Sequence, residues 1–257
     1  MKRRIVVAWV GAWVGAALAL AGCNAPVEGT KGEDARLDDG WTGAPSISAV
    51  TLQGGRLLVS GDAPPRARVV LRGDQDTAFA AGADEAGRFE LLVGVLSSPM
   101  LLTPEVQIGQ FPAPGPERLV LAGDGGVGGT GGPLLAALLI EGGASRRLSA
   151  GPVVDSVDGD GHGLVVAGRA RPGARISVSA DGGAAVEAAA DASGRWTAAL
   201  SSIGDRPARI AVGGAAFAYP GPATGEGVGR IERSGDGWRL TRMLSASARQ
   251  TSWFPDV

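Results

Sequence analysis

This chain of 257 residues contains one cysteine, one histidine and one tyrosine. A single cysteine cannot form an internal disulfide, and with a single histidine it cannot supply the usual ligand set of a zinc site. Lysine occurs only at positions 2 and 31, the formal net charge is −2, and the arginines are scattered through the sequence. A protein that binds nucleic acid needs clustered Lys and Arg, so we expect no nucleic-acid partner.

Glycine and proline are abundant instead. The 43 glycines and 16 prolines, with only 5% aromatic residues, are typical of short strands joined by tight turns. The length allows one large domain or two of ordinary size. The composition therefore favours an all-β protein and leaves the number of domains open.

An internal repeat favours two domains. Residues 45–94 align without a gap on residues 152–201, which lie 107 positions further on, with 17 identities in 50 positions. The identities fall at turns and at every second position of the expected strands. This spacing indicates a duplicated β unit rather than a shared composition.

The most specific part of the repeat is a hairpin. Residues 84–89 (DEAGRF) match residues 191–196 (DASGRW). The Asp side chain can accept hydrogen bonds from the turn backbone, and Gly can adopt the positive φ that closes the turn. The exchange of Phe89 for Trp196 predicts a core position that either ring can fill.

These features resemble bacterial immunoglobulin-like and carboxypeptidase-regulatory-like β-sandwich domains, which occur in tandem on envelope proteins. The resemblance implies an all-β fold of two tandem immunoglobulin-like β-sandwiches, at residues 45–150 and 151–257. Each copy is expected to end in a further strand pair. The pairs are residues 118–122 with 134–140 and residues 229–233 with 238–243. Sandwiches of this kind serve many functions, so the fold alone does not select one.

The N-terminus carries a second resemblance. Three basic residues at positions 2–4 precede an uncharged apolar run at 5–20, and the run leads into Leu-Ala-Gly-Cys at 20–23. This resembles the signal of bacterial lipoproteins, and the resemblance implies cleavage between Gly22 and Cys23 and lipidation of Cys23. The alternative is an uncleaved membrane anchor, for which the apolar run is slightly short.

Residues 23–44 are expected to form a flexible tether, because they are polar, acidic and rich in glycine. Asn24 follows the lipidated position, whereas lipoproteins kept in the inner membrane mainly carry Asp there. We therefore expect a lipid-anchored protein of the outer membrane of a Gram-negative cell, with inner-membrane anchoring as the alternative. Cleavage leaves 21 basic and 26 acidic residues, a formal charge of −5, which disfavours binding to anionic lipid headgroups.

Three aspartates stand near the only histidine, His162. An EF-hand that begins at Asp158 would need an acid or amide at its fifth position and Glu at its twelfth, where the sequence has His162 and Arg169. We therefore expect a polar hairpin turn at Asp155, Asp158 and Asp160, with no metal and no cofactor. No catalytic motif surrounds His162, so we expect no enzyme activity.

Two apolar features remain. The run LLAALLI at residues 134–140 is too short to span a membrane, and we expect it to be a buried strand. Trp238 and Trp253, with Phe254, form the group best suited to stack on a sugar, with core packing as the alternative reading.

The sequence as a whole predicts a non-catalytic envelope lipoprotein that acts as an interaction, adhesion or spacer module. Its partners would be the membrane, through the lipid anchor, and an envelope protein or polysaccharide. The alternative is a carbohydrate- or peptidoglycan-binding module that uses Trp238 and Trp253.

Overall fold

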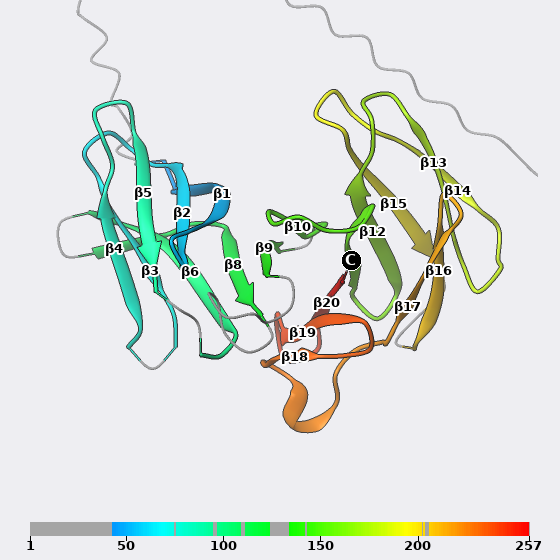
Figure 1. Ribbon diagram of the computed structural model, residues 1–257. Coiled ribbons are helices and arrows are strands. Elements are labelled where there is room, and N and C mark those ends of the chain that lie inside the picture. The colour runs from blue at the N-terminus through cyan, green and yellow to red at the C-terminus, as the bar shows by residue number, and fades with distance from the viewer. Residues whose placement is uncertain are drawn as a thin grey trace, which may run out of the picture. The chain divides into compact units, whose positions relative to one another are not determined.

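The protein is described by a computed structural model that covers residues 43–256, except 75, 95–96, 109–110, 124–133, 142, 202 and 204–205. The described residues form twenty β-strands and one short 3-10 helix at Gly225–Gly227 (Figure 1). The predicted all-β fold class is confirmed, and the several sheets are those expected of β-sandwich repeats. Among these residues, no helix has the length and hydropathy that a membrane crossing requires.

The first copy of the repeat contains two antiparallel sheets. The smaller sheet has the order β1 (Ser46–Gln53), β2 (Arg56–Asp62), β5 (Arg88–Val93). The larger sheet has the order β10 (Arg146–Arg147), β9 (Leu135–Ile140), β8 (Glu117–Ala122), β6 (Met100–Ile108), β3 (Arg68–Arg72), β4 (Ala78–Gly82), and β7 (Phe111–Pro114) also pairs with β6. Side chains from both sheets form one apolar cluster, which includes Ile47, Leu57, Leu71, Phe89 and Leu138.

The second copy also has two antiparallel sheets, with the strands distributed differently. One sheet has the order β15 (Arg195–Ser201), β12 (Gly163–Arg169), β11 (Val154–Gly159), β20 (Arg249–Pro255), β19 (Gly237–Met243), β18 (Ile231–Arg233). The other has the order β14 (Val186–Ala189), β13 (Arg175–Ala180), β16 (Ala208–Val212), β17 (Ala215–Tyr219). A second apolar cluster lies between them and includes Val157, Ile176, Trp196, Ile210 and Trp253.

The predicted hairpin turn is present in both copies. The Asp84 Oδ1 atom accepts hydrogen bonds from the backbone N–H groups of Ala86 and Arg88, both at 2.8 Å. Asp191 accepts the equivalent bonds from Ser193 and Arg195, at 2.7 and 3.0 Å. The glycines of the two turns have φ values of 83° and 79°, as the positive φ of such a turn requires.

The aromatic residue after each turn packs on a glycine of the neighbouring strand. Trp196 lies opposite Gly168, and Phe89 lies opposite Gly61. A Cβ atom added to Gly168 would lie 2.0 Å from the Val153 carbonyl oxygen and 2.6 Å from the Trp196 ring. Both glycines therefore leave the space that the ring occupies, which explains why Phe and Trp exchange at this position.

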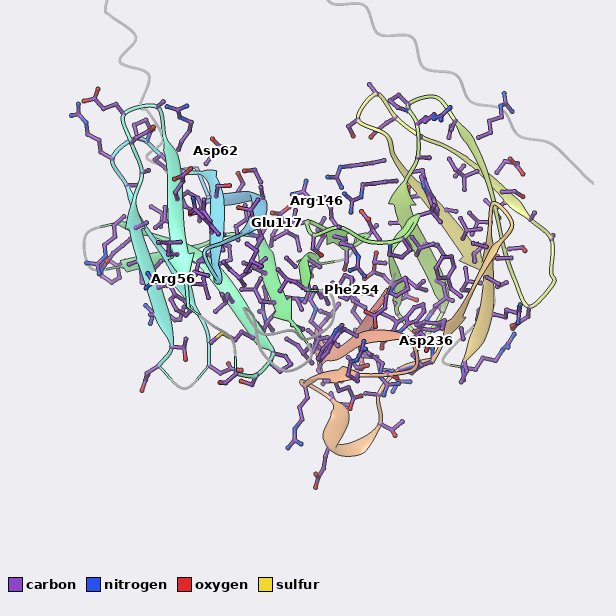
Figure 2. All side chains as sticks on the ribbon, viewed as in Figure 1. Arg56, Asp62, Glu117, Arg146, Asp236 and Phe254 are labelled. Atoms are coloured by element: carbon purple, nitrogen blue, oxygen red, sulfur yellow. The ribbon has the colours of Figure 1, made fainter. Side chains whose placement is uncertain are left out.

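A third apolar cluster joins the two copies. It combines Val120, Ala122, Leu135, Ala137 and Leu139 of β8 and β9 with Trp238, Leu240 and Phe254 of β19 and β20; Phe254 is labelled in Figure 2. The alternate residues of β9, Ala136 and Leu138, point into the core of the first copy. Strand β9 is therefore buried on both faces, which explains its continuous apolar sequence and confirms the predicted burial of this run. Residues 42–257 belong to one compact unit, so the predicted boundary at residues 150 and 151 stays a prediction.

Candidate functional site

The predicted lipidation site lies outside the described residues. Gly22 and Cys23 precede residue 43, and so does nearly all of the predicted tether. Cleavage before Cys23 and its acylation therefore stay predictions from the sequence.

Trp238 and Trp253 lie in the interior. They are only 5% and 1% exposed, and the neighbouring Phe254 is 1% exposed. The Trp253 ring meets Tyr219 edge to face at a centroid distance of 6.2 Å, and its Nε1–H donates to the Ser234 carbonyl oxygen at 3.0 Å.

The face of the Trp238 ring is also occupied, because the Arg233 guanidinium lies 5.1 Å from its centroid. Neither indole offers a free face to a sugar in this packing. The geometry thus gives no support to ligand contact at Trp238 and Trp253, and it supports the core role that the sequence left as the alternative.

The three aspartates of the β11–β12 hairpin serve three different purposes. Asp155 is bound to the Arg169 guanidinium at 2.9 Å. Asp160 accepts hydrogen bonds from the backbone N–H groups of His162 and Gly163, at 2.8 and 3.0 Å, which closes the turn. These turn bonds lower the pKa of the Asp160 carboxyl. Within the described residues, no group of three or more acidic, His or Cys side chains could hold a metal ion.

Asp158, the third aspartate, is the centre of a buried polar cluster. Its carboxylate accepts hydrogen bonds from the Ser145 N–H at 2.8 Å, the Ser145 Oγ at 2.6 Å, the Ser156 Oγ at 2.8 Å and the Ser252 Oγ. Burial raises the pKa of Asp158, and the hydrogen bonds from Ser145, Ser252 and Ser156 oppose that rise. Because Ser145 lies before β10 and Ser252 on β20, the cluster ties the end of the first copy to the second.

Beside this cluster lies an open hollow of about 390 Å³. Its walls include Leu164, Leu200 and Leu244, and Gln250 and the exposed His162 also line it. The Gln250 side-chain amide donates to the Ile140 carbonyl oxygen at 3.2 Å, which makes a further link to β9. Apolar walls with a few polar groups are suited to binding. The hydrogen bond of His162 to Asp160 is made by its backbone N–H.

Sequence reasoning missed the buried role of Asp158. The spacing of the three aspartates drew attention to a metal loop, whereas the partners of Asp158 come from residues 145, 156 and 252. No local signal identified this role, because the burial of β11 along its whole length depends on strands from distant parts of the chain. A carboxylate in such a strand requires several donors.

Comparison with known proteins does not assign the chain to a family. No protein-family model matches its sequence, and no curated protein matches it either.

Proposed function

We propose that the chain is a non-catalytic lipoprotein of the bacterial envelope, and that its two-copy β unit acts as an interaction, adhesion or spacer module. The observation that carries the proposal is the sequence Leu-Ala-Gly-Cys at residues 20–23, which follows a basic and then an apolar segment. Acyl chains on Cys23 would hold the protein at a membrane, since each buried methylene contributes about 0.8 kcal/mol.

The arrangement of the two copies is suited to a spacer. Trp238, Leu240 and Phe254 pack against β8 and β9, and Asp158 bonds both Ser145 and Ser252. A contact with an apolar core and buried hydrogen bonds restricts motion between the copies, so that a partner bound at one end stays at a defined distance from the anchor. The resemblance of each copy to immunoglobulin-like and carboxypeptidase-regulatory-like domains is in keeping with this use.

The rival proposal is a carbohydrate- or peptidoglycan-binding module. The burial of Trp238 and Trp253 weakens it, because these rings were its expected sugar contacts. A polysaccharide or peptide could still reach the apolar hollow near Leu164 and His162. The test is retention of the protein on purified peptidoglycan. The rival is supported if the natural chain and the distant Leu52→Asp variant are retained and the Leu244→Asp variant is not. Both leucines are exposed, so neither substitution places a charge in a core.

The anchor is tested by labelling cells with a palmitate analogue. We expect the full chain to incorporate label and the Cys23→Ala variant to remain an unlabelled precursor. Equal labelling of Cys23→Ala would refute the anchor. Membrane fractionation then tests the location: the natural chain should be found in the outer membrane, and Asn24→Asp should move it to the inner membrane.

A further inference from the structure

The two copies differ in charge at two of three equivalent positions on one face of the β-sheet, and the third position is arginine in both. Each of the three positions lies 107 residues after its counterpart. The first copy has Ser48, Asp62 and Arg88, and the second copy has Asp155, Arg169 and Arg195. Ser48 and Asp155 both stand at the irregularity where the register of the first strand shifts against the second.

The substitution of Arg169 for Asp62 places two arginines opposite each other. Arg169 on β12 pairs with Arg195 on β15 in the antiparallel ladder, just as Asp62 pairs with Arg88 in the first copy. Directly opposed residues of such a ladder project from the same face, and like charges there are destabilising. The second copy thus carries an unfavourable pair where the first carries opposite charges.

Two more arginines approach from the end of the first copy. Arg146 and Arg147 form β10, and Figure 2 labels Arg146 beside that strand. Arg147 is only 2% exposed and donates to the Pro255 carbonyl oxygen. Arg146 is half-buried and donates to the Ile47 carbonyl oxygen at 3.2 Å. Both hydrogen bonds go to neutral carbonyl groups, which leaves the two positive charges without an ion pair among the described residues.

The negative charge nearby is limited. Asp155 binds Arg169 at 2.9 Å. Asp191 already accepts three hydrogen bonds within its own turn, including the backbone N–H of Arg195. In the described part of the chain, the Arg195 guanidinium has no hydrogen-bond partner, whereas its counterpart Arg88 is held by Asp84 at 3.1 Å. Asp256, whose charge also acts on Arg147, is bound to Arg233. Four guanidinium groups therefore face one carboxylate, Asp155, that no residue outside the group engages.

We infer that Arg146, Arg169 and Arg195 form an anion-binding site for a phosphate group, carried by free phosphate or by a phosphate ester. Arg169 is 41% exposed, and Arg146 and Arg195 are half-buried, so the guanidinium groups are within reach of a solute. Guanidinium groups bind phosphate oxygens through paired hydrogen bonds. A phosphate dianion offsets more of the excess positive charge than one carboxylate would. The site exists only when both copies are in place, because Arg146 belongs to the first copy and the other two to the second.

The electrostatics agree with this geometry. Burial lowers the pKa of Arg195, and the positive charges of Arg146 and Arg169 lower it further, against the opposing effects of Asp155 and Asp191. The pKa of Arg147 is also lowered, by burial first; the charges of Asp155 and Asp256 oppose this, and Arg169 adds a smaller lowering effect as a like charge. The Arg169 guanidinium also donates to the Ser149 carbonyl oxygen at 3.0 Å, which places it beside the segment that follows Arg146 and Arg147. An anion is stabilised where positive charges gather in this way.

The site goes beyond the proposed function, because it depends on neither the anchor nor a protein partner. The test is a titration of the purified full chain in non-ionic detergent with inorganic phosphate, against chloride at equal ionic strength. We expect saturable binding by calorimetry and a raised melting temperature. The Arg195→Gln and Arg169→Gln variants should bind phosphate at least tenfold more weakly. Arg88→Gln, the matched change in the first copy, should bind as the natural chain does.

A second titration with glycerol 3-phosphate distinguishes the sources. Similar affinities would indicate free phosphate, and affinity at least tenfold higher for the ester would indicate a phosphorylated lipid or polysaccharide. The inference is overturned if phosphate and chloride act alike, if Arg195→Gln binds normally, or if Arg88→Gln weakens binding equally.

Stability without phosphate supplies an independent readout. At low salt, Arg195→Gln should melt at a higher temperature than the natural chain, because it relieves the opposed arginines, whereas Arg88→Gln should melt at a lower one. A lowered melting temperature of Arg195→Gln would show that Arg195 is a structural residue and would also overturn the inference.

Discussion

The two copies agree over their hairpins and differ in the sheet that their last three strands join. In the first copy β8, β9 and β10 extend the sheet of β3, β4 and β6, through pairing of Met100–Leu102 with Leu119–Leu121. In the second copy β18, β19 and β20 extend the sheet of β11, β12 and β15, where Val157 pairs with Trp253.

The lengths of two equivalent strands reflect this difference. Strand β6 is nine residues long, and its first residues form the ladder to β8. Its counterpart β16 is five residues long and begins directly after Pro207. Within the described residues β16 pairs with β13 and β17 alone, and the last strand of the second copy, β20, pairs with β11 instead.

The consequence is a contact between the copies. The faces of β8 and β9 that the first copy does not bury are covered by β19 and β20 of the second. A duplicated sequence has thus produced two unequal halves, each of which completes the burial of the other. Matched substitutions in the two halves test this mutual burial.

Adjacent leucines on β9 separate the two roles of that strand. Leu138 lies in the core of the first copy and Leu139 in the cluster between copies, and both are buried. Leu138→Ala and Leu139→Ala should each lower the free energy of unfolding by about 2–5 kcal/mol. Hydrogen exchange should quicken in the first copy alone for Leu138→Ala, and also in β19 and β20 for Leu139→Ala. Identical exchange patterns for the two variants would contradict a shared cluster.

Substitution of the glycine beneath each aromatic ring should have the next largest effect on stability. Gly168→Ala should lower the free energy of unfolding by about 1–3 kcal/mol, since the new methyl group overlaps the Val153 carbonyl oxygen and the Trp196 ring. Gly61→Ala should do the same in the first copy, where the Ser46 carbonyl oxygen is 2.0 Å from the added Cβ. Gly82→Ala is the control, because nothing lies within 4 Å of its added Cβ. A melting temperature of Gly168→Ala equal to that of Gly82→Ala would show that the ring does not need this space.

Asp158 has no acidic counterpart in the first copy, where Thr51 stands at the equivalent position. The loss of stability on substitution of Asp158 should depend on pH. Asp158→Asn loses acceptors for Ser145 and Ser156 and should cost about 1–2 kcal/mol near pH 4. Because the folded-state pKa of Asp158 is raised, the folded protein holds a proton that the unfolded chain has released. The contribution of this carboxyl to stability therefore falls as pH rises above the unfolded value of about 4 and through the folded pKa.

The difference in the free energy of unfolding between the natural chain and Asp158→Asn should consequently shrink as the pH rises. Denaturant unfolding from pH 4 to pH 8 measures this difference. Asp160→Asn is the control with the opposite sign, since the folded-state pKa of Asp160 is lowered and its contribution is lost as the pH falls. A difference for Asp158→Asn that grows with pH would show that the four hydrogen bonds outweigh burial.

Local features of this fold could be read from the sequence. The alternation at Arg175–Ala180, the turn glycines and the final strand pairs are each fixed by a few neighbouring residues, and the structure confirms them. Burial of residues 134–140 was also predictable, because an exposed apolar strand would aggregate.

Contacts between distant segments could not be predicted in the same way. No local pattern shows that β20 pairs with β11 while β10 pairs with β9, because the partner of each strand is set by contacts across the whole fold. The roles of Asp158 and Trp253 depend on this pairing, which brings Ser252 and Tyr219 to them. Arg169 and Arg195 likewise seemed scattered along the chain, although they lie opposite each other on β12 and β15.

The smallest expected change in stability comes from a substitution in the first copy that reproduces the opposed arginines of the second. Asp62→Arg would place an arginine opposite Arg88, as Arg169 lies opposite Arg195 in the second copy. We expect a loss of about 0.2–1 kcal/mol at low salt, and recovery of most of it at high salt, because exposed charges are screened. Asp62→Asn removes the attraction without adding repulsion and should lose less.

Phosphate should not restore the stability of the Asp62→Arg protein beyond the rise seen in the natural chain. The new pair stands beside Ser48 and Asp84, with Arg88 bound to Asp84, and Arg146 is the group that completes the arginine cluster of the second copy. An additional phosphate-dependent rise would mean that two opposed arginines suffice to bind the anion. The site would then be a property of the charge pair alone, and the contribution of Arg146 from the neighbouring copy would be unnecessary.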